Sequence, residues 1–184
     1  VESCENTIDL TREIKNVATT LTVESDFLPV TAIHIEPYLR EEKTRLENIY
    51  DNVDVTLDIH DKNKMVDANS LISSVLSNLT NNAVLHNDST EPTHVHITLE
   101  SDEDVARISV SDNGSGIPSE KQKTLFDIDE SRTHGDTGFG LPLTYHITRG
   151  LGGDLQLKET GSSGSTFVLE LQCSSPSDYP KNRI

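Results

Sequence analysis

The chain has 184 residues, enough for one well-packed domain with an appendage but not for two full domains. It carries 31 Asp and Glu against 15 Lys and Arg, which gives a formal net charge of −16, and it contains no Trp. This balance disfavours a nucleic-acid partner, because no basic patch exists that could follow a phosphate backbone.

The first part of the chain predicts a helix and a connector. Residues 5–24 carry apolar residues near helical spacing, at Ile8, Ile14, Val17, Ala18 and Leu21. Residues 26–37 form a connector in which Pro29 and Pro37 bracket a short extended run. Pro37 fits the first turn of a second helix, whose apolar residues are Tyr38, Leu39, Leu46, Ile49 and Tyr50.

A strand and a polar-edged helix come next. Residues 53–59 alternate between apolar and polar side chains, as expected of a half-buried strand. Asp67 or Asn69 can cap the helix that follows. Its expected apolar face consists of Leu71, Ile72, Val75, Leu76, Leu79 and Ala83.

Three asparagines on this helix differ in direction. Asn78 and Asn82 are four residues apart and therefore lie one above the other at the edge of the apolar face, whereas Asn81 points to the opposite side. Two stacked amide oxygens can bind magnesium directly or through water and link it to phosphates. A ladder of amides on the helix surface is the structural alternative, and the two glycine clusters downstream favour the metal.

Residues 94–99 and 105–110 predict a strand hairpin around residues 101–104. His94 and His96 point to the same face of their strand. They could form a metal pair, but without a third ligand we expect two solvated histidines.

The hairpin runs into Asp112 to Ile117, which reads Asp-Asn-Gly-Ser-Gly-Ile. A carboxylate at a strand end can accept a hydrogen bond from an exocyclic amine, and Gly114 and Gly116 let a flat ring lie against bare backbone. A tight turn after an edge strand is the alternative. Residues 118–135 form a polar stretch with one apolar cluster, Leu125 and Phe126.

A second glycine cluster, Thr137 to Leu141, opens a helix that runs to about Arg149. Backbone amides at a helix start beside flexible glycines suit phosphate binding. Residues 152–153 end this helix, and strands at 154–157 and 166–171 follow, with residues 161–164 as their turn. Residues 174–184 read as a loose tail.

Taken in this order, the asparagine helix and the two glycine clusters resemble the nucleotide-binding domain of sensor histidine kinases, in the GHKL superfamily. The resemblance covers roughly residues 65–171. It implies the Bergerat fold, a two-layer α/β sandwich whose mixed, mainly antiparallel sheet carries helices on one face. It also implies three parts. Residues 1–28 would be the end of a dimerisation hairpin with its connector, residues 29–173 the ATP-binding domain, and residues 174–184 a flexible tail. The helix at 5–24 could instead be a tail helix that packs on its own domain.

The resemblance implies binding of ATP and Mg²⁺. Asn82 would be the main metal ligand with Asn78 as its helper, and Asp112 would bind the adenine amine. Residues 118–135 would form a short lid, in which Arg132 or His134 could reach phosphate or remain solvated surface. The further nucleotide-binding residues would be Gly114, Gly116, Ile117, Arg132, Thr137, Gly138, Phe139, Gly140, Leu141 and Thr166.

Position 78 separates the branches of this superfamily. ATP-hydrolysing members place a glutamate there as the general base, whereas Asn78 cannot take a proton at neutral pH. Asn78 therefore favours the histidine-kinase branch, in which the γ-phosphoryl group passes to a neutral imidazole. None of the seven histidines has the setting of a phosphoacceptor, so we expect the acceptor on an upstream helix. A response-regulator aspartate would receive the phosphoryl group next, and the full-length protein would be a homodimer.

Two departures support an alternative, a catalytically weak or inactive nucleotide-binding module of the same fold. Leu85 stands where the family commonly has Lys or Arg, and the lid is short. The loss of that cation could weaken phosphate binding unless Arg132, His134 or His86 compensates.

Further features predict the setting of the protein. Cys4 and Cys173 lack metal-ligand spacing, which fits a reducing cytoplasm. No apolar run approaches the ~18 residues of a membrane helix, so we expect no membrane contact from this segment. Because the chain begins at Val1, we expect a piece of a longer protein, whose other parts could include a membrane segment. The net charge fits either a merely acidic domain or, as we favour, a halophilic, haloarchaeal-type one, because molar salt screens surface charge within ~3 Å.

Overall fold

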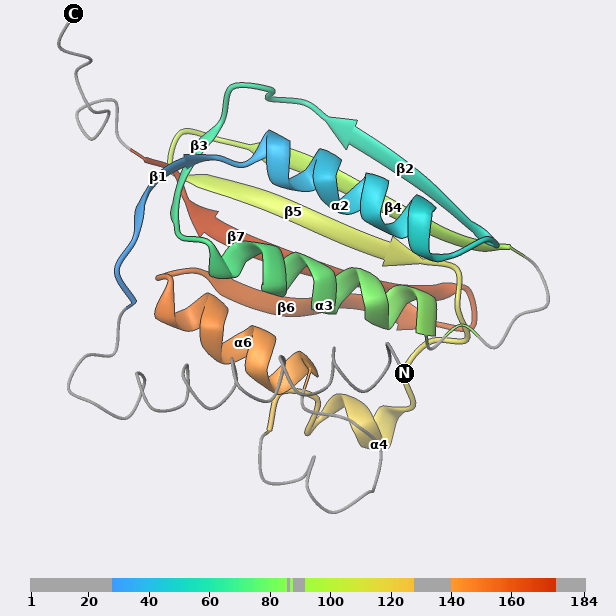
Figure 1. Ribbon diagram of the computed structural model, residues 1–184. Helices are drawn as coiled ribbons and strands as arrows, with labels where there is room; N and C mark the ends of the chain where they lie inside the picture. The colour runs from blue at the N-terminus through green and yellow to red at the C-terminus, as the bar shows by residue number, and fades with distance from the viewer. Residues whose placement is uncertain (1–27, 86, 88–91, 128–139, 175–184) are drawn as a thin grey trace, which may run out of the picture.

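The computed structural model describes residues 28–85, 87, 92–127 and 140–174. A five-stranded mixed sheet has the order β2-β4-β5-β7-β6, in which β2 and β4 are parallel and the other neighbours are antiparallel. Helices α2, α3 and α6 cover one face of this sheet (Figure 1). The predicted two-layer α/β architecture is therefore confirmed.

The elements in chain order have the following bounds: β1 Thr31–His34, α2 Glu36–Ile49, β2 Val53–Ile59, β3 Met65–Ala68, α3 Leu71–Leu85, β4 Thr93–Ser101, β5 Val105–Asp112, α4 Ser119–Gln122, α6 Gly140–Gly150, β6 Asp154–Gly161 and β7 Gly164–Gln172. The helix expected over residues 5–24 lies outside the described residues.

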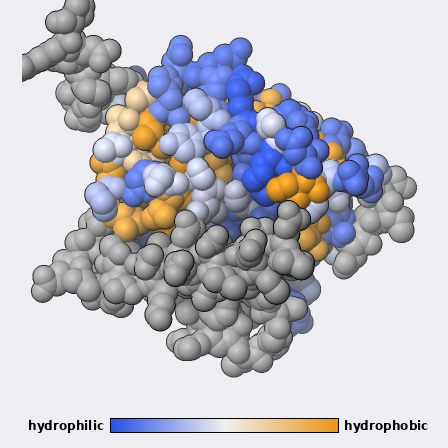
Figure 2. Space-filling view, viewed as in Figure 1, coloured by the Kyte–Doolittle hydropathy of each residue, from blue (hydrophilic) through white to orange (hydrophobic). Residues whose placement is uncertain are grey.

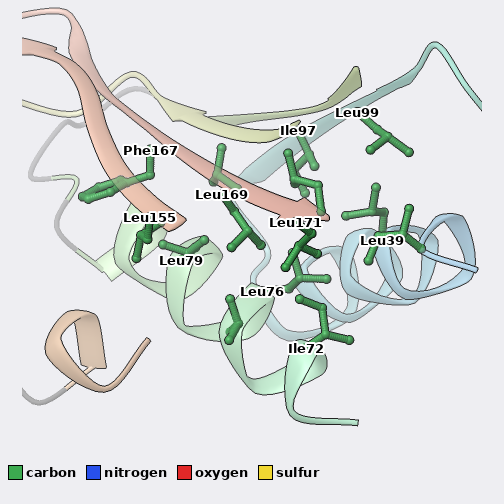
Figure 3. Packing of buried hydrophobic residues seen from close by; sticks show 14 of the residues in the cluster. Leu39, Ile72, Leu76, Leu79, Ile97, Leu99, Leu155, Phe167, Leu169 and Leu171 are labelled. Carbon is green, nitrogen blue, oxygen red and sulfur yellow. The ribbon is translucent and has the colours of Figure 1, made fainter. Parts of the chain in front are cut away.

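The core forms between the helices and one face of the sheet. Strand side chains alternate, and those of β4, β5 and β7 that point toward the helices are mostly apolar. Helix α3 presents its expected apolar face to them, and Ile72, Leu76 and Leu79 are at most 1% exposed. Figure 3 shows Leu79 beside Leu155 and Leu169, and Ile72 and Leu76 beside Leu171.

Of the two residues predicted to cap α3, only Asn69 does so. Asn69 caps the helix, because its Oδ1 accepts a hydrogen bond from the Leu71 amide at 3.0 Å. Asp67 lies in β3, a strand that the sequence pattern did not indicate. Strand β3 pairs with β1, the extended run between Pro29 and Pro37, in a separate two-stranded sheet.

Both ends of the described chain are bound to the domain. The amide of Leu28 donates to the carbonyl of Gly150 at the end of α6, at 2.7 Å. Ser174, expected at the start of the tail, is buried, and its hydroxyl donates to Asp67 at 2.6 Å. Residues 175–184 lie outside the described part.

The surface is mostly polar. Figure 2 shows hydrophilic residues over α2 and over the connection between β2 and β3. Among the large apolar side chains of the described part, the exposed ones are Val30, Ile49 and Leu85.

Candidate nucleotide-binding site

Helix α3 lies between α2 and α6 on the covered face of the sheet (Figure 1). This arrangement brings the asparagine helix to the start of α6. A Cβ atom added at Gly140, the first residue of α6, would lie 3.9 Å from Oδ1 of Asn78. The polar edge of α3 and the end of the second glycine cluster therefore meet, as the sequence predicts for a phosphate site.

Asn82 lies one turn further along the same edge of α3. Its amide nitrogen is buried and has no hydrogen-bond partner within the part of the chain that the structure describes. A buried polar group without a partner costs about 1–3 kcal/mol. The residues here thus fit a polar ligand, and Asn78 and Asn82 supply the amide oxygens that magnesium accepts as ligands.

Asp112 is the last residue of β5, a strand that contacts α3. Its Oδ1 accepts hydrogen bonds from the backbone amides of Gly114, at 2.8 Å, and Ser165, at 3.2 Å. These two amides fix the orientation of the carboxylate.

The structure does not bring Thr166 to Asp112. Thr166 is opposite Ser111 in the β5–β7 register, and their hydroxyls are hydrogen-bonded at 2.9 Å on the open face of the sheet. Ser165 shares the covered face with Asp112 and is 5% exposed. Ser165 therefore lies on the same side of the sheet as Asp112 and touches its carboxylate, a position that the resemblance did not indicate.

The glycine loop after Asp112 lies against the β6–β7 turn. Gly116 has φ +78°, and a Cβ atom there would lie 2.8 Å from the carbonyl carbon of Gly161. The amide of Ile117 donates to Oγ1 of Thr160 at 2.8 Å. Because only glycine permits both this φ and this approach, Gly116 shapes the loop and supports it on the turn.

Asn113 ties the other side of this loop to the start of β4. Its Oδ1 accepts hydrogen bonds from the His94 amide at 2.9 Å and from the Asn87 side chain at 2.7 Å. Its Nδ2 donates to the carbonyl of Pro92 at 3.1 Å. The glycine loop is thus connected to the segment that follows α3.

The described part of the expected lid begins on this loop. In α4, Gln122 donates to the carbonyl of Ile117 at 2.7 Å. Phe126 stacks on Tyr145 of α6, with ring centroids 5.0 Å apart. Leu141 packs on the core in the first turn of α6. The expected ligands Arg132, His134, Thr137, Gly138 and Phe139 lie outside the described residues.

One of the two departures, Leu85, and the two strand histidines lie on the surface. Leu85, at the end of α3, is 65% exposed and brings no positive charge to the phosphate region. His94 and His96 lie on the open face, 3.3 and 2.8 Å from Asp54 and Asp58 of β2. Each histidine thus faces a carboxylate of the neighbouring strand, and both histidine side chains are about half exposed.

Comparisons with known proteins agree with this geometry. Residues 67–175 match the family model described as histidine kinase-, DNA gyrase B- and HSP90-like ATPase. The sensor histidine kinase AruS of Pseudomonas aeruginosa is 32% identical over 151 residues, which cover 75% of this chain and 14% of AruS. The chain therefore spans only a small part of this curated relative.

Solved structures share the fold. The nucleotide-free catalytic domain of histidine kinase ThkA superposes with a TM-score of 0.67 and 25% identity, over 79% of this chain and 96% of that domain. Full-length ShkA, solved in complex with AMPPNP, gives a TM-score of 0.77 over 95% of this chain and 37% of ShkA. At 18% identity, ShkA shows likeness of fold alone.

Proposed function

This chain belongs to the family of histidine kinase-, DNA gyrase B- and HSP90-like ATPases, and on that premise we propose that it is the ATP-binding catalytic domain of a sensor histidine kinase. It binds ATP with Mg²⁺ and donates the γ-phosphoryl group to a histidine on a separate upstream helix. The likeness to AruS and ThkA supports the kinase branch.

In this proposal Asp112 accepts a hydrogen bond from the adenine amine, and Gly114, Gly116 and Ile117 form the wall beside the base. Two backbone amides already orient the Asp112 carboxylate, which supports this role. Ser165 replaces Thr166 as the hydroxyl-bearing residue on this side of the sheet.

Asn82 and Asn78 bind the magnesium ion in the same proposal, and the start of α6 at Gly140 and Leu141 faces the phosphates. The ion would neutralise charge on the phosphoryl group that is transferred. The protein contributes mainly positioning, because Asn78 cannot act as a base and the acceptor imidazole is itself a nucleophile. Arg132, Thr137, Gly138 and Phe139 remain proposed contacts.

The meeting of Asn78 with Gly140 carries the proposal, because it joins the two sequence motifs in one place. The test is transfer of label from γ-labelled ATP to a histidine of the full-length protein, with Asn82→Ala as the inactive control. Acid-labile label that requires Asn82 would support the proposal. Tight ATP binding without transfer in the full-length protein would overturn it.

The exposed Leu85 favours a second candidate, a nucleotide-binding module with weak or no transfer. Restoring the family cation with Leu85→Lys separates the two. A large gain in transfer rate would favour the weak module, whereas an unchanged rate would favour a site that does not need this cation.

The remaining proposals concern the whole protein. The full-length protein is a homodimer that also contains the phosphoacceptor domain, and it passes the phosphoryl group to a receiver domain of a response regulator. It works in the cytoplasm, in keeping with the free thiol of Cys173, and in a halophilic organism, in keeping with its charge. Within the described residues no helix is long and apolar enough to cross a membrane.

A further inference from the structure

A buried carboxylate links α2 to the asparagine helix. Glu42 of α2 is 5% exposed, although a charged residue in a helix with alternating charges is ordinarily solvated. Its Oε2 accepts a hydrogen bond from the hydroxyl of Ser77 at 2.8 Å, and its Oε1 accepts one from the hydroxyl of Thr80. Both hydroxyls belong to α3, so one carboxylate bonds two successive turns of that helix.

Arg45 completes this cluster. Its guanidinium lies 2.5 Å from Oε1 of Glu42 and donates to Oδ1 of Asn81 at 2.9 Å. The hydroxyl of Tyr50 is 3.5 Å from the same Asn81 oxygen. Asn81, expected to point away from the site as a bystander, therefore takes part in the contact between α2 and α3.

The cluster and the metal-binding edge occupy different sides of α3. At about 100° per residue, Ser77, Thr80 and Asn81 fall within an arc of about 100° that faces α2. Asn78 and Asn82 fall on a neighbouring arc, and Asn78 lies beside the start of α6. Because α3 is a rigid helix, a bond that holds the side chains of the first arc in place also fixes the direction in which Asn78 and Asn82 point.

We propose that Glu42 is a positioning residue for the magnesium site, because its hydrogen bonds to Ser77 and Thr80 set the rotation of α3 and thereby the places of Asn78 and Asn82. This inference rests on the proposed function of the site. The apolar contacts of Leu39 and Leu46 hold α2 on the core, but the hydrophobic effect itself is non-directional. Hydrogen bonds to a buried charge are directional and therefore restrict the rotation of α3 further.

The required precision is high. If α3 rotated by about 20°, a side-chain atom on the order of 5 Å from its axis would move by on the order of 2 Å. A misplacement of about 1 Å can cost on the order of a hundredfold at a reacting centre.

The test compares Glu42→Gln with Leu46→Ala, which removes apolar contact from the same helix and leaves the cluster intact. Affinity for ATP is measured with Mg²⁺ and with EDTA, and the ratio gives the gain due to the metal. For Glu42→Gln we expect that gain to fall about tenfold or more with little change in EDTA. For Leu46→Ala we expect the gain to stay as in the wild type.

If Glu42→Gln keeps the wild-type gain in ATP affinity due to Mg²⁺, the inference is overturned and the proposed function stays intact. The same holds if Leu46→Ala loses as much of this gain as Glu42→Gln does. A wild type that binds no ATP would overturn the proposed function instead. The inference is then still tested by the side-chain amide NMR signals of Asn78 and Asn82 without nucleotide. Those signals should shift in Glu42→Gln and not in Leu46→Ala. Ser77→Ala, which removes one bond, should give a smaller shift of the same signals, and unchanged signals in both cluster variants would overturn the inference.

Discussion

The backbone amide of Ser165 donates a hydrogen bond to Oδ1 of Asp112 at 3.2 Å across the β5–β7 pair. The Gly114 amide donates to the same oxygen at 2.8 Å. Because both amides donate to Oδ1, this oxygen is occupied within the protein, and in the proposed site Oδ2 is the oxygen that faces a ligand.

Asp112→Asn is expected to lower ATP affinity roughly ten- to a hundredfold. The amides of Gly114 and Ser165 will bind the asparagine oxygen, so its NH₂ group must stand where the second carboxylate oxygen stood. That group would then face the adenine amine as donor against donor, which costs about 1–3 kcal/mol. Calorimetric ATP titration measures the change, with Asp54→Asn on the open face as control. A folded Asp112→Asn variant with wild-type affinity would remove Asp112 from the site.

The sequence contained a signal that places Ser165 at the site. Phe167, Leu169 and Leu171 alternate as buried residues, and a period of two puts Ser165 on their face and Thr166 on the other. The resemblance implies Thr166 instead, whose hydroxyl bonds Ser111 on the open face. Period arguments were reliable where the alternation was long, as in β2, whose predicted bounds of 53–59 are those of the structure.

The missed features depend on long-range pairing. Strand β3 has four residues and pairs with β1, more than 30 positions earlier in the chain. Glu42 lies among charged residues typical of a solvated helix face, and its partners Ser77 and Thr80 are 35 and 38 residues away. No local pattern indicates such a contact, because its cause is the packing of α2 on α3.

The three asparagines of α3 are expected to respond differently to alanine. Asn82→Ala should abolish magnesium-dependent ATP binding, and Asn78→Ala should weaken it. Asn81→Ala should keep the magnesium dependence and lower the free energy of unfolding by about 1–2 kcal/mol, because Arg45 loses an acceptor. Urea unfolding and ATP titration with and without Mg²⁺ separate these effects. An equal loss of binding at 81 and 82 would contradict the assignment.

Gly116→Ala should destabilise the protein more than Gly152→Ala. The two glycines have nearly the same φ, +78° and +79°, so the backbone cost of about 1–2 kcal/mol is common to both. A Cβ atom at Gly116 collides with the backbone of Gly161, whereas nothing lies within 4 Å of one at Gly152. The difference between their unfolding free energies measures the support of the glycine loop by the β6–β7 turn. Equal costs would mean that this contact contributes nothing.

The contribution of Glu42 to stability should depend on pH. Burial by itself raises the pKa of Glu42, but the hydrogen bonds from Arg45, Thr80 and Ser77 together outweigh burial and leave the pKa below its ordinary value. A lowered pKa in the folded state means that the contribution is fully present above the unfolded pKa of about 4.3 and is lost as the pH falls through the folded pKa.

Urea unfolding of wild type and Glu42→Gln between pH 7 and pH 3 isolates this effect, because the other carboxylates titrate in both proteins. The difference in unfolding free energy should be constant above about pH 5 and shrink below about pH 4. A difference that grows as the pH falls would show that burial dominates and that the pKa of Glu42 is raised.

High salt should strengthen both folding and nucleotide binding. The charge of −16 is spread along the chain, with acidic pairs or runs at residues 41–42, 102–104 and 127–130. At ~0.01 M salt the Debye length is ~30 Å, so most of these charges repel one another and the incoming triphosphate. At ~1 M it is ~3 Å, and repulsion within the compact state fades. Leu85 should make nucleotide binding still more dependent on salt, because α3 lacks the positive charge that the family commonly has at this position.

Thermal unfolding from 0.05 to 3 M KCl, with ATP titration at each concentration and magnesium fixed, tests this dependence. Screening should raise both the melting temperature and the affinity early and then saturate, whereas salt exclusion from apolar surface would continue to raise the melting temperature at higher concentration. Leu85→Lys serves as the matched variant, since its added charge near the phosphates should flatten the salt dependence of affinity while leaving that of melting almost unchanged. If melting temperature and affinity are both flat in the wild type, the acidity has no role in salt adaptation and the halophilic proposal is wrong.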